Sequence, residues 1–193
     1  MFAWLNTSYS PVRVDNSAAR CSTADTCWYT CRRAAIATTA FSSIRFNVDP
    51  YDDRTGLRSW GASAHVAELN LYEGAALLVY GVGSNPGGYN QGDHTPNKAF
   101  DGDLATKWLD DEKKPLVLTF PAPVRVTSYE WATAYDNTAA DPVKWSLEGS
   151  NDGISWLSID HTHAHGVYPT SLARQQWQGP FIVPGANPTS PSV

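Results

Sequence analysis

The chain has 193 residues, a length that fits one domain of ordinary size with extensions. Charged residues make up 17% and aromatic residues 12%, a balance too aromatic and too weakly charged for a disordered chain. The net charge of −5 argues against nucleic-acid binding, which needs a basic face, and against electrostatic docking on an anionic membrane. No apolar run approaches the roughly 20 residues of a membrane-spanning helix.

The N-terminal segment, residues 1–40, differs from the rest of the chain in composition. It is rich in Ser, Thr, Ala and Arg and shows no sustained period, which predicts an irregular extension with a short helix around residues 31–39. Its apolar start is interrupted at Asn6, too early for the core of a signal peptide. The segment also holds all three cysteines, Cys21, Cys27 and Cys31, for which reduced thiols, one disulfide and a shared metal ion remain open.

Residues 41–184 contain a series of short strand patterns separated by turns rich in Gly, Pro and Asn. In the first of them, Ile44, Phe46 and Val48 alternate with polar residues. The predicted strands, in chain order, are 43–48, 66–72, 76–80, 116–120, 124–134, 143–150, 156–160 and 176–183. Many short strands without a long helical period predict an all-β, antiparallel sandwich or barrel, followed by a Pro-rich tail at 185–193.

Two segments of this region carry a distinctive pattern. Residues 97–108 are NKAFDGDLATKW, and residues 141–153 are DPVKWSLEGSNDG with Trp156 after them. Together with residues 44–46 (IRF) and 66–69 (VAEL), they resemble the discoidin family, also called the coagulation-factor V/VIII C-type domain, which is related to galactose-binding-like carbohydrate-binding modules. The resemblance covers roughly residues 42–184 and implies an antiparallel jelly-roll β-sandwich. Trp108 and Trp145 are expected in its core, because aromatic side chains dominate core burial.

The order of these segments departs from the family pattern. In most members the strands that resemble residues 44–46 and 66–69 end the domain, whereas here they come first. We interpret this order as a circular permutation, which a sandwich tolerates when its ends lie close together. In the alternative, residues 41–73 are the end of a truncated upstream copy, and the domain would then lack a pair of core strands and leave a sheet edge open.

The segment Asp101-Gly102-Asp103 places two carboxylates in a tight turn that glycine makes feasible. Like charges this close repel unless a cation or N–H donors intervene, so the turn predicts either a Ca²⁺ site or a metal-free Asx-turn. The family resemblance implies a structural Ca²⁺ that clamps this loop to a neighbouring strand. The ligands that it implies are Asp101, Asp103, Thr106 and Glu68, with the main-chain carbonyls of Lys98 and Ala67.

In this fold a ligand is usually bound by loops at one end of the sandwich, and the loops 85–94, 134–140 and 161–174 are the candidates here. Sugar recognition needs an aromatic face for the ring and planar polar groups for its hydroxyls. The side chains that offer this mixture are Tyr89, Asn90, His94, Tyr135, Asp136, Asn137 and Arg174. For each of them the alternative is an ordinary solvated turn residue. The same loops carry no exposed aliphatic cluster, which disfavours membrane insertion.

Motifs for catalysis are missing from the sequence. It contains no nucleophile elbow, zinc-protease helix, P-loop or dinucleotide turn, so no enzyme activity is predicted. His161, His163 and His165 alternate and would share one face of a strand, where three imidazoles could bind Zn²⁺ or Cu²⁺. An exposed edge or loop is the commoner outcome for such a stretch.

These observations lead to the expectation of a non-catalytic binding module, stabilised by Ca²⁺, that recognises a carbohydrate on a surface or matrix. The rival expectation is a structural subunit that uses the same sandwich for protein–protein contacts in a larger assembly, with its tails as docking arms. The resemblance implies an extracellular or cell-surface location, whereas the start of the sequence is also consistent with an intracellular or organellar assembly.

Overall fold

The computed structural model describes residues 39–49, 63–79 and 81–186. Within these ranges the chain forms short strands and two 3₁₀ helices, η1 (Pro96–Ala99) and η2 (Thr138–Ala140), with no α-helix. The strands are β1 (Phe41–Asp49), β2 (Ala64–Val66), β3 (Glu68–Glu73), β4 (Ala76–Leu77), β5 (Val82–Ser84), β6 (Trp108–Asp110), β7 (Leu116–Val124), β8 (Ser128–Ala132), β9 (Lys144–Ser150), β10 (Leu157–Asp160) and β11 (Trp177–Ile182).

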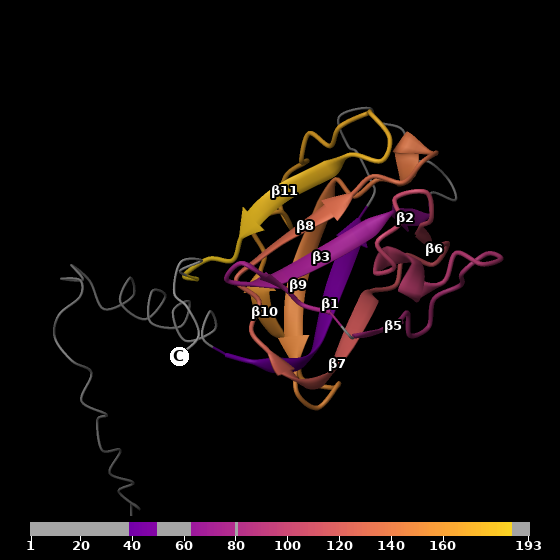
Figure 1. Ribbon diagram of the computed structural model, residues 1–193. Coiled ribbons are helices and arrows are strands. Elements are labelled where there is room, and N and C mark those ends of the chain that lie inside the picture. Colours follow the sequence, from indigo (N-terminus) through magenta and orange to yellow (C-terminus); the bar gives the residue numbers. More distant parts are fainter. Residues whose placement is uncertain (1–38, 50–62, 80, 187–193) are drawn as a thin grey trace, which may run out of the picture.

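The strands form two main layers. A five-stranded sheet has the order β10-β9-β1-β7-β5, and a four-stranded sheet has the order β11-β8-β3-β4. A third, two-stranded sheet consists of β2 and β6. All pairings are antiparallel. Figure 1 shows β11, β8 and β3 lying in front of β9 and β1. The prediction of an all-β, antiparallel sandwich is therefore confirmed.

Strand β1 lies at the centre of the five-stranded sheet, although it comes first in the described sequence. Phe46 is opposite Leu116 of β7 on one side and opposite Leu147 of β9 on the other. In the second sheet, Leu71 of β3 is opposite Tyr129 of β8. Residues 41–49 and 64–73 therefore complete the same sandwich as residues 108–182.

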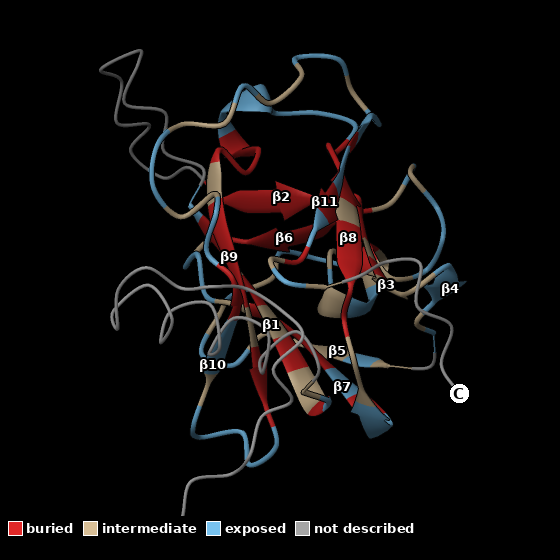
Figure 2. Ribbon diagram, turned by 90° about the vertical axis from the view of Figure 1, so that its left-hand side faces the viewer, coloured by how far each residue is buried: buried red, intermediate tan, exposed pale blue. Residues whose placement is uncertain are grey.

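The core fills the space between the two layers, where Figure 2 shows the buried faces of the strands. Trp108 and Trp145 are both buried in it, as predicted. Trp145 packs against Trp131 of the opposite sheet at a ring-centroid distance of 5.4 Å. Its indole N–H donates to the hydroxyl of Tyr129, and that hydroxyl donates to Asp160. These bonds satisfy the polar atoms of Trp145 and Tyr129, whereas the buried indole N–H groups of Trp108 and Trp131 have no partner in the described part of the chain.

The observed strands differ from the predicted ones in several places, and β4, for example, ends at Leu77, short of the predicted strand 76–80. The predicted strand 66–72 is divided at Ala67, because β2 pairs with β6 while β3 pairs with β8. The predicted strand 124–134 is also divided, because β7 continues to Val124 and β8 begins only at Ser128. The short strands β5 and β6 were not predicted, because three residues carry too little periodicity.

The cysteines, all but the last residue of the helix predicted around residues 31–39, and almost all of the terminal extensions lie outside the described residues.

Candidate functional site

The turn at Asp101-Gly102-Asp103 closes in the way that the sequence predicts. Gly102 has a φ of 77°, a value that glycine adopts without strain. The amide of Asp103 donates to Asp101 Oδ1 and to Glu68 Oε1, at 3.1 Å in both cases. The hydroxyl of Thr106 lies 3.0 and 2.9 Å from the two carboxylate oxygens of Asp101. Side chains from β3 and from the loop after η1 therefore converge on one point.

Two main-chain carbonyls face the same point. The Thr106 hydroxyl lies 3.3 Å from the carbonyl oxygen of Lys98 and 3.2 Å from that of Asp103. The ammonium group of Lys98 also pairs with Asp101, at 3.2 Å. Ala67 precedes Glu68 in the chain, and its amide donates to the carbonyl of Ala132. Five of the six predicted cation ligands are thus connected by direct contacts. The sixth, Ala67, is the residue before Glu68 in the chain.

The electrostatics of this turn depend on the approach of two carboxylates. Burial, together with contact with Asp101, raises the pKa of Glu68 to about 7. The pKa of Asp101 is lowered instead, because hydrogen bonds from Thr106 and Asp103 outweigh the opposing effect of its partial burial. A proton on Glu68 or a bound cation would relieve the repulsion. Carboxylate, carbonyl and hydroxyl oxygens form the donor set that Ca²⁺ prefers, so the residues fit this ion.

The described residues contain no cluster of three or more His, Cys, Asp and Glu side chains arranged for a metal ion. A cation at Asp101 would therefore depend on the two carboxylates and on main-chain carbonyls. The alternating histidines do not converge on a common metal site. The His163 ring stacks on Trp145 with a centroid distance of 4.5 Å, whereas Nε2 of His161 lies 3.3 Å from Oε1 of Glu148.

An open, polar cleft of about 540 Å³ lies beside this turn, because Lys107, the residue after Thr106, lines it. Its lining residues come from β2, from the loop before η1, from β6 and its flanks, and from the loop that leads into η2; they are Ser63, His65, Gln91, Gly92, His94, Lys107, Leu109, Asp111, Asp136 and Asn137. Three of the predicted ligand residues are among them: His94, Asp136 and Asn137.

The other predicted ligand residues lie around the cleft. The Tyr89 ring is exposed, and its backbone amide donates to Asp110. The amide of Asn90 holds the carbonyl of Leu109 at 2.6 Å and so supports the wall of the cleft. The ring of Tyr135 lies 4.8 Å from the ammonium nitrogen of Lys107.

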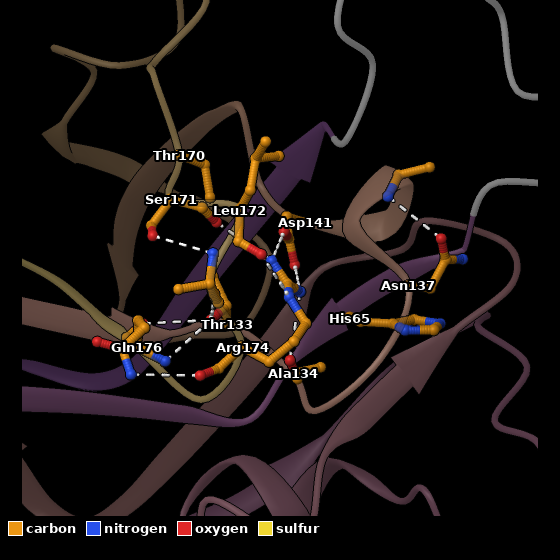
Figure 3. A network of polar contacts seen from close by, with 12 residues as sticks. His65, Thr133, Ala134, Asn137, Asp141, Thr170, Ser171, Leu172, Arg174 and Gln176 are labelled. Carbon is orange, nitrogen blue, oxygen red and sulfur yellow. Dashed lines mark hydrogen bonds and ion pairs between the residues drawn. The ribbon is translucent and has the colours of Figure 1, made fainter.

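Arg174, also predicted to contact a ligand, directs its donors into the protein. It forms a bidentate ion pair with the buried Asp141, at 2.9 and 2.6 Å. Its remaining donors reach the carbonyls of Ala134, Asp136, Ser171 and Leu172. Figure 3 shows the guanidinium group between these segments, with His65 and Asn137 nearby. The side chain therefore fastens the loop at 134–141 to the loop at 171–174.

Lys107 is the lysine among the residues that line the cleft. Only 2% of its side chain is exposed. Its ammonium nitrogen lies 2.8 and 2.6 Å from the oxygens of Asp136, and 3.2 Å from Nδ1 of His65. An ammonium group has three N–H donors, and these three contacts use all of them.

The side chains of Ser63, His65 and Asp136 have distances that suggest a catalytic triad. Ser63 Oγ lies 2.6 Å from Nε2 of His65, and Nδ1 lies 3.3 Å from Asp136. Lys107 decides the direction of the hydrogen bonds, since its ammonium group can only donate and therefore makes Nδ1 the acceptor. Nε2 then carries the proton and donates to Ser63. Burial, assisted by Lys107, lowers the pKa of His65 to about 4. The imidazole is consequently not placed as a general base for Ser63.

Sequence reasoning missed His65, Lys107, Ser63, Gln91 and Asp111. Two of them carry a local signal. His65 interrupts the buried strand β2, and Lys107 sits between the turn at Thr106 and the buried Trp108. A polar residue between buried neighbours needs a partner, and that requirement could have marked both positions.

No family model matches this sequence, and comparisons with the curated proteins and with the solved structures found no match either. Among the described residues, no helix has the length and apolar character needed to cross a membrane.

Proposed function

We propose that this chain is a non-catalytic carbohydrate-binding module with the galactose-binding-like jelly-roll form of the β-sandwich, stabilised by Ca²⁺ at Glu68 and Asp101. The observation that carries the proposal is the polar cleft of about 540 Å³ beside the Asp101 turn. Its size lies in the range of about 300–1,000 Å³ that is usual for small-molecule sites.

The polar groups of the cleft suit a ring with several hydroxyl groups. A hydroxyl both donates and accepts, so its recognition needs both kinds of partner. Asp136 and Asp111 supply acceptors, and the amides of Gln91 and Asn137 supply donors as well as acceptors. The exposed ring of Tyr89 and the partly exposed ring of Tyr135 lie near the rim and offer apolar faces for the C–H side of a sugar.

The cation would act on the cleft through the backbone. Thr106 closes the Asp101 turn, and the next residue, Lys107, lines the cleft. Clamping the turn to Glu68 of β3 would therefore fix the position of Lys107. This coupling favours a structural role for the ion in ligand binding, without any contact between the ion and the sugar.

The test is thermal unfolding of the chain with Ca²⁺ or with a chelator, repeated over a panel of simple sugars. A ligand that binds only the folded state raises the midpoint by mass action. We expect a rise with Ca²⁺ and a further rise with one class of sugar. The variant His94→Ala should reduce the sugar response, because His94 lines the cleft. The matched control is His165→Ala, an exposed histidine outside the cleft.

A Ca²⁺ response without a response to any sugar would reject the carbohydrate proposal in favour of a role in protein–protein contacts. A chain that ignores Ca²⁺ would reject the ion at Asp101.

A further inference from the structure

Among the described lining residues, Lys107 is the one with a permanent positive charge, and it is not available to a ligand. Lys107 uses its three donors on Asp136 and His65 and is almost fully buried. His65 is buried as well, and its two ring nitrogens are taken up by contacts with Ser63 and Lys107. An anionic sugar would therefore meet no positively charged donor from Lys107 or His65.

Negative charge, by contrast, remains available on two sides of the cleft. Asp111 Oδ2 accepts a hydrogen bond from Gln91 at 2.5 Å, while Oδ1 has no partner among the described residues. The side chain of Asp136 is 41% exposed although it pairs with Lys107. Asp93, next to His94 at the rim, is almost fully exposed. The three carboxylates outnumber the single buried ammonium group.

We propose that the cleft selects a sugar with a free, protonated amine over the same sugar with a hydroxyl or N-acetyl group at the equivalent position, and over the corresponding uronic acid. This inference rests on the proposed carbohydrate-binding function and specifies its ligand class. The amine would donate to Asp111, the carboxylate with an unused oxygen, while the ring hydroxyls bond to Asp136, Asn137 and Gln91.

The physical reason is the difference between charged and neutral hydrogen bonds. A bond between an ammonium group and a carboxylate is roughly twice as strong as one between neutral groups. N-acetylation removes the charge and leaves a single neutral N–H donor, and a carboxylate adds repulsion from Asp111 and Asp136. We expect about tenfold tighter binding of the amino sugar than of the parent sugar at low salt, with the difference shrinking as salt screens the charges.

Isothermal titration calorimetry at about pH 6, where amines are protonated and carboxylates ionised, tests the inference. The ligands are galactosamine, galactose, N-acetylgalactosamine and galacturonic acid, followed by the corresponding glucose series. In each series every compound differs from the parent sugar at one position. The variant Asp111→Asn should lose about tenfold more affinity for galactosamine than for galactose, because an amide oxygen still accepts from a hydroxyl but carries no charge for the amine. The control is Glu112→Gln, an exposed neighbouring carboxylate that does not line the cleft.

Equal binding of the amino and the parent sugar, or a preference for the acid, would overturn this inference and leave the proposed function standing. Preference for the amine that survives Asp111→Asn would also overturn it. Binding of none of these sugars, by a chain that unfolds cooperatively in the presence of Ca²⁺, would overturn the proposed function and this inference together.

Discussion

Glu68 lies buried at the start of β3 beside Asp101, whose own side chain is 29% exposed. Its pKa of about 7 means that the folded state binds a proton more tightly than the unfolded chain does. In the absence of a cation, this group therefore lowers stability as the pH rises from about 4.5 to about 7. A cation reverses the balance, because it favours the ionised carboxylate.

The variant Glu68→Gln separates these two effects. The glutamine oxygen can still accept from the Asp103 amide, and its NH₂ group can donate to Asp101. Without Ca²⁺ at pH 7 we expect the variant to be more stable than the unchanged protein, by an amount on the order of 1–3 kcal/mol. With Ca²⁺ the order reverses. Urea unfolding with and without chelator measures both differences, and Glu112→Gln serves as the exposed control. Equal Ca²⁺ stabilisation of both proteins would contradict the role of Glu68.

His65 makes the stability of the folded state depend on pH in the opposite direction to Glu68. Its folded-state pKa of about 4 lies below the usual value of 6.5, so between these values the unfolded chain binds the additional proton. Stability from this group is complete above about pH 6.5 and is lost as the pH falls towards 4, with a total on the order of 3 kcal/mol. Urea unfolding across this range in saturating Ca²⁺ measures the slope. His65→Gln should flatten it, and an unchanged slope would exclude His65 as the source.

The residues of the Asp101 turn could be predicted from sequence because they lie within six positions and carry a distinctive order. The partners of the cleft could not. His65 lies 42 positions from Lys107 and 71 from Asp136, and no local pattern connects them. Only the pairing of β2 with β6 brings His65 beside the end of the turn.

At the scale of elements, the two loops at 134–141 and 171–174 depend on one ion pair. Burial raises the pKa of Asp141 even with Arg174 beside it, so the aspartate depends on that partner for its charge. Four carbonyls from both loops accept from the same guanidinium group. The loops are therefore held as a unit, although they lie far apart in sequence.

Arg174→Ala would leave Asp141 as a buried charge without a partner. We expect a loss of about 3–5 kcal/mol in the free energy of unfolding, measured by urea denaturation. The matched control is Arg125→Ala, which removes a pair with Glu73 that is 30% exposed on both sides and should cost under about 1 kcal/mol. Similar losses for the two variants would show that Arg174 does not fasten the loops.

Strand prediction succeeded where the alternation was long, as in β1 and β9, and failed where a strand changes partners. Residues 66–72 alternate only from Glu68 onwards, after the two successive apolar residues Val66 and Ala67. The break at Ala67 arises because β2 pairs with β6 outside the main sheets, and that pairing depends on a strand of only three residues. The packing of distant strands, rather than local preference, sets this boundary.

At the scale of the whole molecule, the two ends of the sandwich lie near each other. Phe41 at the start of β1 is opposite Val124, and Val183 after β11 donates to the carbonyl of Thr127. Figure 1 shows the indigo start of β1 and the yellow end of the described chain on the same side. Nearby ends are the condition under which permuted orders of one fold interconvert.

A permuted variant makes this testable. Joining residue 186 to residue 39 with a flexible linker, and opening the chain in the turn between Gly74 and Ala75, places β1 to β3 at the end of the sequence. We expect it to unfold cooperatively and to keep its Ca²⁺ response, measured by circular dichroism. The control is the same join opened within β9, between Leu147 and Glu148, which interrupts pairing with both β1 and β10. If the permuted variant also failed to fold, as we expect of the control, the proposed equivalence of the two strand orders would be contradicted.

The central position of β1 has a consequence for synthesis on the ribosome. Arg45 of β1 and its partner Glu148 on β9 are separated by 103 positions. At typical elongation rates of about 5–20 residues per second, β1 would emerge roughly 5–20 s before that partner. During this interval its apolar face and its unpaired backbone groups are exposed to other chains. We therefore expect β1 to stay unpaired on its β9 side until the middle of the sheet can close.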